Sequence, residues 1–263
     1  MNSLKRYEEL AVETRCTIID IAASDVGCHI GGSLSVCDIL LYSLDRFLPN
    51  ENNCVVLSKG HAAAALYSAL FKLGYLDEDP SESYGKEGSL FTGHPSHLIP
   101  NVKFATGSLG HGVGYATGWA LAHQQPHNYG KAVVICGDGE LQEGLCWEVL
   151  QIVSAYRLSN FIIVIDLNGG QNDGLVDDIS PMYSLPDRIR SYGFDVVEID
   201  GHHFAEIEKA YDQHTGIRPM AIIAHTMKGK GVTTLEGNAA SHYACIKRFQ
   251  AINWKREVKN ALC

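Results

Sequence analysis

The sequence lacks the features that mark several special classes of protein. It has no apolar run near the roughly 20 residues of a membrane span, and its first residues, MNSLKRYEE, contain no apolar segment of a secretion signal. Internal repeats and low-complexity tracts are absent, and a chain of 263 residues with 46% hydrophobic and 19% charged residues is neither disordered nor collagen-like. We therefore expect a soluble, cytoplasmic protein without a membrane partner, with residues 1–263 forming a single domain.

Closely spaced cysteine pairs are also missing. Eight cysteines are present, yet none forms the C-x-x-C pair of a zinc or redox site. Several lie inside apolar runs, as Cys136 does after Val133, Val134 and Ile135. We interpret the cysteines as small buried hydrophobic residues of a reducing compartment, and not as disulfides or zinc ligands.

Positive charge is scarce. The 21 Lys and Arg residues stand against 30 Asp and Glu residues, which gives a formal net charge of −9. A chain of this charge repels a nucleic acid backbone and an anionic lipid surface. We therefore expect neither nucleic acid nor membrane as a partner.

Short apolar runs alternate with longer segments of helical periodicity. The runs expected to form strands are 54–57, 132–136, 161–166, 196–199 and 221–224. The segments expected to form helices are about 4–24, 33–45, 61–73, 110–124, 143–157, 203–214 and 241–258. Continuous apolar runs are typical of parallel strands that are covered on both faces. The pattern predicts an α/β fold with a doubly wound, mostly parallel sheet flanked by helices.

Two long segments, about 75–109 and 167–190, show no regular period and are rich in Gly, Pro, Ser and Asp. Irregular segments of this length in a compact domain are usually functional or disordered. We expect the ligand to bind there.

Polar residues follow two successive strands of the predicted sheet. Asp138 lies in the Gly137-Asp138-Gly139 turn after one strand, and Asn168 follows the next strand. In a right-handed βαβ unit both strand ends lie at the same edge of the sheet, where ligands of open α/β sheets bind. Carboxylate and amide oxygens suit Mg²⁺ or Ca²⁺. One carboxylate cannot neutralise a divalent cation, so the sequence predicts a metal-bridged diphosphate site, in which Gly139 lets the backbone approach a phosphate.

Other phosphate-binding motifs fit less well. A dinucleotide fingerprint requires glycine where Gln142 stands, and an aspartate between its glycines would repel a pyrophosphate that lacks a metal. The segment 228–231, KGKG, has neither the spacing nor the Ser or Thr of a P-loop. A plain glycine-rich turn remains an alternative for GDG taken alone.

Five of the 12 histidines lie beside glycines or at turns: His29, His61, His94, His111 and His242. Glycine allows a backbone turn to hold an imidazole at the mouth of a cleft, so we predict that these five surround the ligand. The others are interpreted as surface or satisfied core residues: His97, His123, His127, His202, His203, His214 and His225. No His or Cys pair has the spacing of a zinc site.

Six motifs occur in an order that resembles the amino-terminal, diphosphate-binding half of transketolases. They are CHIGGSLS, LSKGHAAAALY, FTGHP, GSLGHG, GDGELQEG with DLNGGQNDG, and HTMKGKGV followed by His242. The His-Gly loops distinguish this family from the alpha subunits of 2-oxo acid dehydrogenases. The resemblance implies a thiamine diphosphate-binding fold, with thiamine diphosphate and Mg²⁺ as cofactors.

The resemblance also implies roles for individual residues. It implies that the side chains of Asp138 and Asn168 and the carbonyl of Gly170 hold the metal. The residues implied to bind the cofactor are His61, Gly107, Ser108, Leu109, Gly137, Asp138, Gly139, Glu140, Asn168 and His242.

The resemblance implies substrate binding and proton transfer at a second set of residues. His29, His94 and His242 would line the substrate channel and move protons, and His111 would face the same channel. Glu143 resembles an acid that communicates across the dimer. An acid in the first turn of a helix explains Glu143 about equally well.

The chemistry of the family belongs to the cofactor, whose C2 carbanion adds to a ketose carbonyl before a two-carbon unit passes to an aldose. Family members use a second domain, which supplies a glutamate for the aminopyrimidine and residues that grip the acceptor phosphate. The motifs of that domain are not found in this chain. We therefore expect a separate C-terminal subunit, an α2β2 heterotetramer and no activity from this chain alone.

Two departures from the family and several alternatives remain open. His111 stands where many relatives have glutamine, and segment 237–242 is plainer than usual, which leaves room for a nonstandard sugar donor or acceptor. The alternatives are a subunit of another thiamine diphosphate carboligase or 2-oxo acid decarboxylating enzyme, and a noncatalytic subunit that only holds the cofactor. A nicotinamide-dependent oxidoreductase is disfavoured by the missing fingerprint.

Overall fold

A parallel sheet lies at the centre of the computed structural model, which describes residues 3–261. Its strands are β1 (Cys54–Leu57), β2 (Ala132–Gly137), β3 (Phe161–Leu167), β4 (Asp195–Asp200) and β5 (Met220–His225). Their spatial order is β1-β2-β3-β5-β4, and every neighbouring pair is parallel. The predicted strands are confirmed to within one residue at each end.

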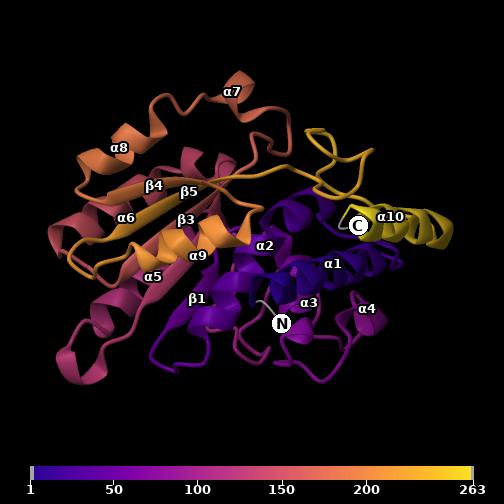
Figure 1. Cartoon of the computed structure of the whole chain (residues 1–263), viewed down its shortest axis with the longest axis horizontal. Coiled ribbons are helices and arrows are strands. Elements are labelled where there is room, and N and C mark those ends of the chain that lie inside the picture. The colour runs from indigo at the N-terminus through magenta and orange to yellow at the C-terminus, as the bar shows by residue number, and fades with distance from the viewer. Residues whose placement is uncertain (1–2, 262–263) are drawn as a thin grey trace.

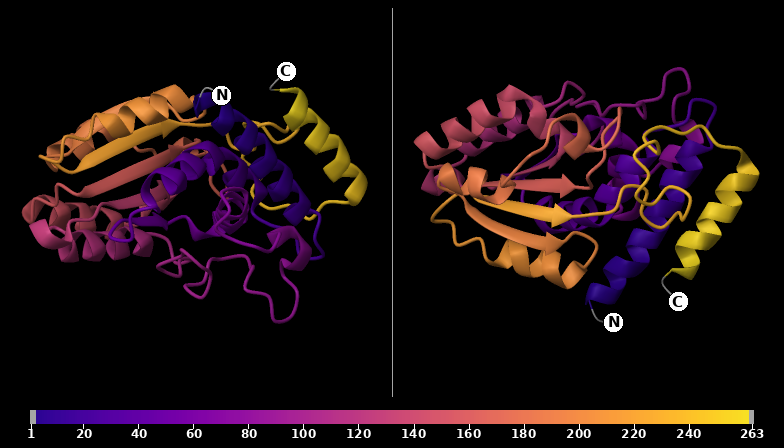
Figure 2. Two further views of the ribbon diagram at one scale, coloured as in Figure 1. Left: turned by 60° about the horizontal axis from the view of Figure 1, so that its bottom comes forward. Right: turned by 90° about the horizontal axis from the view of Figure 1, so that it is seen from above.

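Helices cover both faces of this sheet (Figures 1 and 2). They are α1 (Ser3–Ala22), α2 (Ile30–Phe47), α3 (Ala63–Lys72), α4 (Pro80–Ser83), α5 (His111–Ala122), α6 (Gly144–Ala155), α7 (Val176–Ile179), α8 (Leu185–Ser191), α9 (Phe204–Asp212) and α10 (Arg248–Asn260). Helices α5, α6 and α8 pack on one face, and α1, α2, α3 and α9 pack on the other. The predicted α/β fold with helices on both faces is confirmed.

Alternate side chains of each central strand enter two different cores. Val133 and Ile135 of β2 pack with α2 and α9, whereas Val134 and Cys136 pack with α5 and α6. Both sets are completely buried. The double coverage explains why these strands are continuous apolar runs and do not alternate between apolar and polar residues.

The helix expected over 241–258 begins only at Arg248, so the first third of that prediction was wrong. The backbone of the preceding segment pairs elsewhere: Ala244 and Cys28 exchange N–H···O bonds of 3.0 Å, and the Ile246 amide donates to the carbonyl of Ala22 at 2.9 Å. Because these groups are already paired across the chain, the helix starts later. The segment therefore ties α10 to the end of α1.

The two segments predicted to be irregular contain short helices. Helix α4 lies in the first segment, and α7 and α8 lie in the second. Each has seven residues or fewer, which is too short for a periodic pattern to show in the sequence.

The prediction that the cysteines are buried is correct for five of them: Cys28, Cys37, Cys54, Cys136 and Cys146. It was wrong for Cys245, which is exposed, and for Cys16, which is half-buried. Cys263 lies outside the described residues. All the described cysteines are free thiols.

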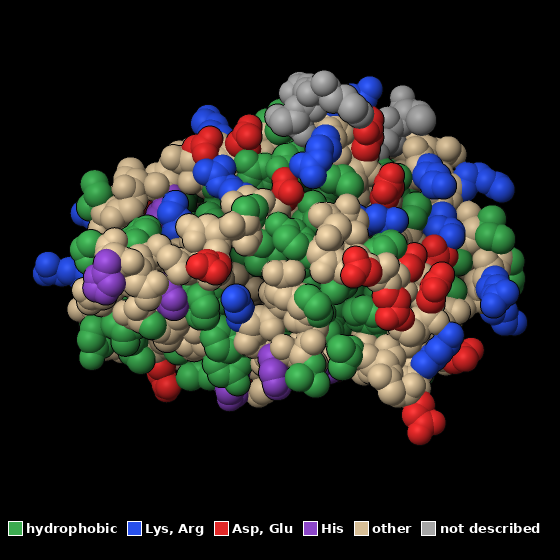
Figure 3. All heavy atoms as spheres, turned by 90° about the horizontal axis from the view of Figure 1, so that it is seen from below, with side chains coloured by type: hydrophobic (Ala, Val, Ile, Leu, Met, Phe, Trp, Pro, Cys, Tyr) green, Lys and Arg blue, Asp and Glu red, His purple; other side chains and the backbone are tan. Residues whose placement is uncertain are grey.

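The surface of the molecule mixes both signs of charge. On the face shown in Figure 3, Lys and Arg side chains are scattered, and several Asp and Glu side chains gather on the right. Across residues 3–261, none of the helices combines the length and the apolar character that a bilayer span requires.

Two glycines of helix α5 allow a matched test of the packing. A methyl group on Gly112 would lie 2.5 Å from the Oγ of Ser58, whereas a methyl group on Gly118 would meet nothing within 4 Å. We expect Gly112→Ala to lower the free energy of unfolding by about 1–3 kcal/mol through overpacking. Gly118→Ala should raise it by about 0.5–1 kcal/mol, because alanine favours the helix. Urea unfolding followed by circular dichroism measures both, and equal effects would refute this packing.

Candidate active site

The carboxyl ends of β2 and β3 bring Asp138 and Asn168 together, as the sequence predicts. Gly137 of β2 is in register with Asp166 of β3. One carboxylate oxygen of Asp138 accepts the Gly139 amide at 2.8 Å, and the other accepts the Gly169 amide at 2.6 Å. The carboxylate therefore bridges the turns that follow the two strands.

Asp138 has little contact with solvent, with 2% of its surface exposed. Burial and the nearby Asp166 raise the pKa of Asp138 to about 6. A carboxylate in this environment is stabilised by a cation.

Asn168 is oriented by its neighbours. Its Nδ2 donates to Asp166 at 3.1 Å and to the Oγ of Ser35 at 3.4 Å. Its Oδ1 accepts the Gly170 amide at 3.1 Å. Because the amide nitrogen faces Asp166, the oxygen is turned toward the end of the sheet, where a metal ligand would be needed.

Asp166 is completely buried and forms an ion pair with the equally buried Lys59. It also accepts the hydroxyl groups of Ser35, at 2.7 Å, and of Thr226. Burial by itself opposes ionisation, but Lys59 and these hydroxyl groups bring the pKa of Asp166 below its usual value. Asp166 is therefore a carboxylate at neutral pH, and it is satisfied within the protein.

Glu140 has an internal role in this structure. Its carboxylate accepts the hydroxyl of Ser58 and the amides of Gly110, at 2.8 Å, and Gly137, at 3.2 Å. The side chain thereby ties the 107–110 loop to the end of β2. Its predicted contact with the cofactor stays a prediction.

A cavity of about 380 Å³ opens at this edge of the sheet. The predicted site residues that line it are His61, Gly107, Leu109, Gly137, Asp138, Gly139, Glu140, Glu143, Asn168, Gly170 and His242. Four other predicted site residues are not among those that line it: His29, His94, Ser108 and His111.

Sequence reasoning did not select two lysines that line the same cavity, Lys59 and Lys228. Lys228 is 2% exposed, and its Nζ donates to the carbonyls of Gln171 at 3.0 Å and Ala239 at 2.9 Å. Burial and nearby Lys59 lower the pKa of Lys228 to about 8. Both lysines follow the carboxyl end of a strand, β1 and β5, and that position was the available signal.

Four histidines form one cluster beside the cavity. The ring of His29 lies 5.0 Å from that of His242, 5.6 Å from His61 and 6.0 Å from His94. The rings of His61 and His242 are 5.5 Å apart. The glycine-rich loops that contain these residues therefore converge, although His29 and His242 lie near opposite ends of the sequence.

Three histidines of the cluster are neutral at physiological pH. Burial and Lys59 lower the pKa of His61 well below its usual value, and burial with Lys228 lowers that of His242 to about 4. Burial and His94 also lower the pKa of His29. The Nδ1 atom of His29 is buried and has no hydrogen-bond partner among the described atoms.

His111 and Glu143 lie farther out. His111 is exposed at the start of α5, where its Nδ1 lies 3.3 Å from the carbonyl of Leu109. Glu143 is exposed at the N-cap of α6, on the wall of the cavity. Glu143 precedes the first turn of α6 and makes no side-chain capping bond, so the expected place in the first turn was wrong by one position. Its role toward a neighbouring subunit stays a prediction.

Comparison with known proteins identifies the family. Residues 8–259 match the family described as "Transketolase, thiamine diphosphate binding domain". The chain is 31% identical to one of the subunits of apulose-4-phosphate transketolase from Phocaeicola vulgatus over 260 residues, which are 95% of this chain and 92% of that protein. It is 37% identical to the 6-deoxy-6-sulfo-D-fructose transketolase subunit SqwG of a Clostridium species over 239 residues, which are 87% and 86% of the two chains.

A solved structure extends the comparison to the fold. The crystal structure of transketolase from Campylobacter jejuni superposes with a TM-score of 0.88 at 32% identity, and the match covers 98% of this chain and 43% of that one. Fold and family match together define a thiamine diphosphate-binding domain. The chain belongs to the transketolase family, and it corresponds to the N-terminal subunit of a transketolase.

The lowered pKa of His242 predicts how stability depends on pH. His242 has a pKa of 6.5 when unperturbed and about 4 in the folded chain, so the unfolded chain binds more protons between these values. His242 therefore costs no stability above about pH 6.5, and it lowers the free energy of unfolding as the pH drops toward 4. His242→Gln should reduce this fall by about 1 kcal/mol, because solvent partly screens the half-buried ring.

Chemical unfolding at pH 7 and pH 4.5 measures the effect, with the exposed His97→Gln as the control. An identical pH dependence in wild type and His242→Gln would contradict the assignment of a neutral, half-buried imidazole.

Proposed function

We propose that this chain binds thiamine diphosphate through a divalent cation, Mg²⁺ or Ca²⁺, as one half of a transketolase. The complete enzyme would transfer a two-carbon ketol unit from a ketose to an aldose, as free sugars or as sugar phosphates. The observation that carries the proposal is the placement of metal-type oxygen donors and two buried lysines around one cavity. Such a set matches both the cation and the anion of a metal diphosphate.

The donor set fits a hard cation. Asp138 is a buried carboxylate whose pKa is raised to about 6, and Asn168 presents its amide oxygen at the same edge of the sheet. Gly170 would add its carbonyl. A side chain at Gly170 would meet Lys228 at 2.9 Å, and one at Gly139 would meet Gln171 at 2.8 Å. The glycines therefore let the side chains of Lys228 and Gln171 lie close against the turns that follow β3 and β2.

Thiamine diphosphate, when bound, supplies the carbanion chemistry that breaks and forms a C–C bond beside a carbonyl. The residues of this chain would bind the cofactor and orient it. Lys228 would neutralise diphosphate charge beside the Lys59–Asp166 ion pair, and the neutral imidazoles of His61 and His242 would donate hydrogen bonds to the diphosphate. The loop of Gly107, Ser108 and Leu109 would hold the aminopyrimidine ring.

Substrate handling is proposed for the histidine cluster. A neutral imidazole, such as that of His29 or His242, can accept a proton at one nitrogen and donate one from the other. The unpartnered Nδ1 of His29 suits a sugar hydroxyl, and His94 and His242 adjoin the same ring. His111 is proposed as a peripheral substrate residue. The names of the two relatives specify different sugars, which supports a sugar substrate.

We propose that the complete enzyme is an α2β2 heterotetramer with a separate C-terminal subunit that carries the pyrimidine-binding domain. The names of two relatives as subunits support this arrangement. Glu143, exposed on the cavity wall, is proposed to face the partner. A single domain over residues 1–263 and a cytoplasmic location complete the proposal, the latter supported by free thiols in the core.

Removal of the metal carboxylate tests the cofactor site. Asp138→Ala should weaken thiamine diphosphate binding at least about a hundredfold, because no other carboxylate of the proposed donor set remains. Isothermal titration of the chain with thiamine diphosphate and Mg²⁺ measures it, with exposed Asp177→Ala as the control. EDTA should abolish binding, and Mg²⁺ or Ca²⁺ should restore it. Binding that survives EDTA would refute the metal bridge.

Reconstitution with the C-terminal subunit tests the reaction. We expect turnover of ketose phosphates only when both subunits are present. His29→Ala should lower kcat about a hundredfold, as loss of a proton-transfer group does, and should change cofactor affinity little. Full activity of His29→Ala would favour the noncatalytic subunit. Activity on pyruvate without activity on ketoses would favour a 2-oxo acid enzyme.

A further inference from the structure

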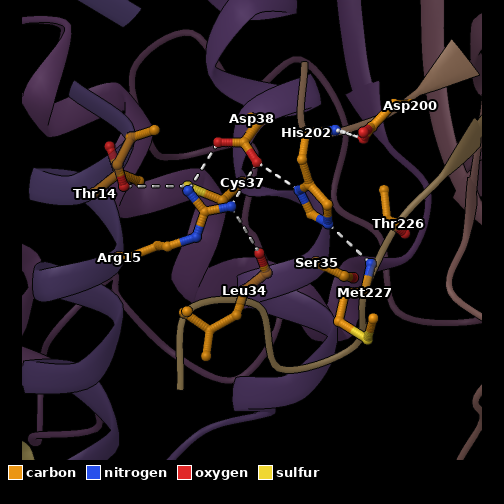
Figure 4. Close-up of polar contacts among 12 residues, drawn as sticks. Thr14, Arg15, Leu34, Ser35, Cys37, Asp38, Asp200, His202, Thr226 and Met227 are labelled. Carbon is orange, nitrogen blue, oxygen red and sulfur yellow. Dashed lines mark hydrogen bonds and ion pairs between the residues drawn. The ribbon is translucent and has the colours of Figure 1, made fainter. Parts of the chain in front are cut away.

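His202 lies outside the cofactor cavity, and its sequence context predicts only a surface or satisfied core residue. It occupies the turn between β4 and α9, where 14% of its side chain is exposed. Its backbone amide donates to the Oδ1 of Asp200 at 2.8 Å. Figure 4 shows the ring between a buried ion pair and the backbone of Met227.

One ring nitrogen faces a permanent anion. The Nδ1 atom of His202 lies 2.7 Å from the Oδ2 of Asp38 in α2, and Asp38 also accepts both terminal nitrogens of Arg15 in α1, at 2.8 and 2.5 Å. Burial opposes ionisation of Asp38, but Arg15 and His202 hold its pKa at about 2. The ionised Asp38 can therefore only accept hydrogen bonds, so the Nδ1 atom of His202 carries the proton between them.

The other ring nitrogen accepts a backbone proton. The Met227 amide donates to the Nε2 of His202 at 2.9 Å. An amide can only donate, so Nε2 must be unprotonated. Asp38 on one side and Met227 on the other thus select a single neutral tautomer of His202.

Met227 belongs to the turn that carries Lys228 into the cavity. The neighbouring residues of this turn are held separately: Thr226 donates to Asp166 through its hydroxyl, and Gly229 donates to the carbonyl of Gly31 at 3.0 Å. The amide of Met227 is held by His202. A bond at this amide restrains the backbone immediately before Lys228.

The two turns are also in direct contact. A methyl group at Gly201 would lie 2.5 Å from the Cγ2 of Thr226. The Gly201 amide donates to the carbonyl of His225 at 2.8 Å. The absence of a side chain at Gly201 is therefore what allows His202 to reach the turn of Lys228.

We propose that His202 is a positioning residue for the cofactor site: through the Met227 amide it fixes the orientation in which Lys228 faces the diphosphate. Arg15 and Asp38 hold the ring in the tautomer that can accept this amide. The inference rests on the proposed function, because it assigns Lys228 to the diphosphate.

Two substitutions distinguish the roles of the two ring nitrogens of His202. His202→Gln places an acceptor oxygen near the position of Nε2, whereas His202→Asn reaches only the position of Nδ1. We expect His202→Asn to weaken binding of thiamine diphosphate with Mg²⁺ about three- to tenfold, the effect of one lost hydrogen bond. His202→Gln should weaken it less than about twofold, because the acceptor for the Met227 amide is kept. The exposed neighbour His203, changed to Asn, should have no effect.

A double-mutant cycle with Lys228→Met distinguishes positioning from general loss of stability. Isothermal titration of the full chain gives the affinities. If His202 acts through Lys228, His202→Asn has no further effect in the Lys228→Met background. An equal effect in both backgrounds would overturn the inference, as would equal weakening by Asn and Gln.

The outcomes also separate this inference from the proposed function. If wild type binds no thiamine diphosphate, or Lys228→Met leaves affinity unchanged, the assignment of Lys228 to the diphosphate fails. If Lys228→Met weakens binding and His202→Asn does not, only the positioning role fails.

Should His202→Asn not fold, amide hydrogen exchange on the wild-type chain decides. Strong protection of the Met227 amide in the chain without ligand supports its bond to His202, and exchange as fast as that of an exposed loop amide overturns the inference.

Discussion

The ion pair between Asp166 and Lys59 is the interaction on which the site depends. Asp166 ends the buried part of β3, and its carboxylate collects donors from Lys59 after β1, from Ser35 in α2 and from Thr226 after β5. Four segments that are far apart in sequence thus meet at one buried anion. A buried charge left without its partner is strongly destabilising, so these segments can only be arranged in the way that satisfies it.

This arrangement determines how the ligand groups point. Asp166 turns the amide nitrogen of Asn168 inward, which leaves the amide oxygen for the cavity. It holds Thr226 at the start of the turn that carries Lys228. Asp166, whose partners all lie inside the protein, therefore positions both Asn168 and the turn of Lys228 at the proposed diphosphate site. Asp138 has no such ion-pair partner and is the carboxylate proposed for the metal.

Local rules were enough to predict the fold and the convergence of Asp138 and Asn168, which are proposed to form the site. Apolar runs identified every strand of the described chain because both faces of the sheet are buried, and the geometry of βαβ units predicted that Asp138 and Asn168 converge. The ion pair of Lys59 could not be predicted in this way, because lysine is buried only when a partner is present, and its partner lies 107 positions away. The same limit applies to Asp38 and His202, which are 164 positions apart. The late start of α10 has a related cause, since its preceding backbone pairs with Cys28.

The electrostatics of the cavity explain how an acidic chain can hold a diphosphate. The raised pKa of Asp138 and the lowered pKa values of Lys228 and His242 share one cause, burial, which disfavours every charged form. A cation beside the carboxylate and an anion beside the lysine each relieve that penalty, and they do so best when the two are bound to each other. The site is thus suited to a metal diphosphate as one unit, and the net charge of −9 is immaterial at this short range because the local groups dominate.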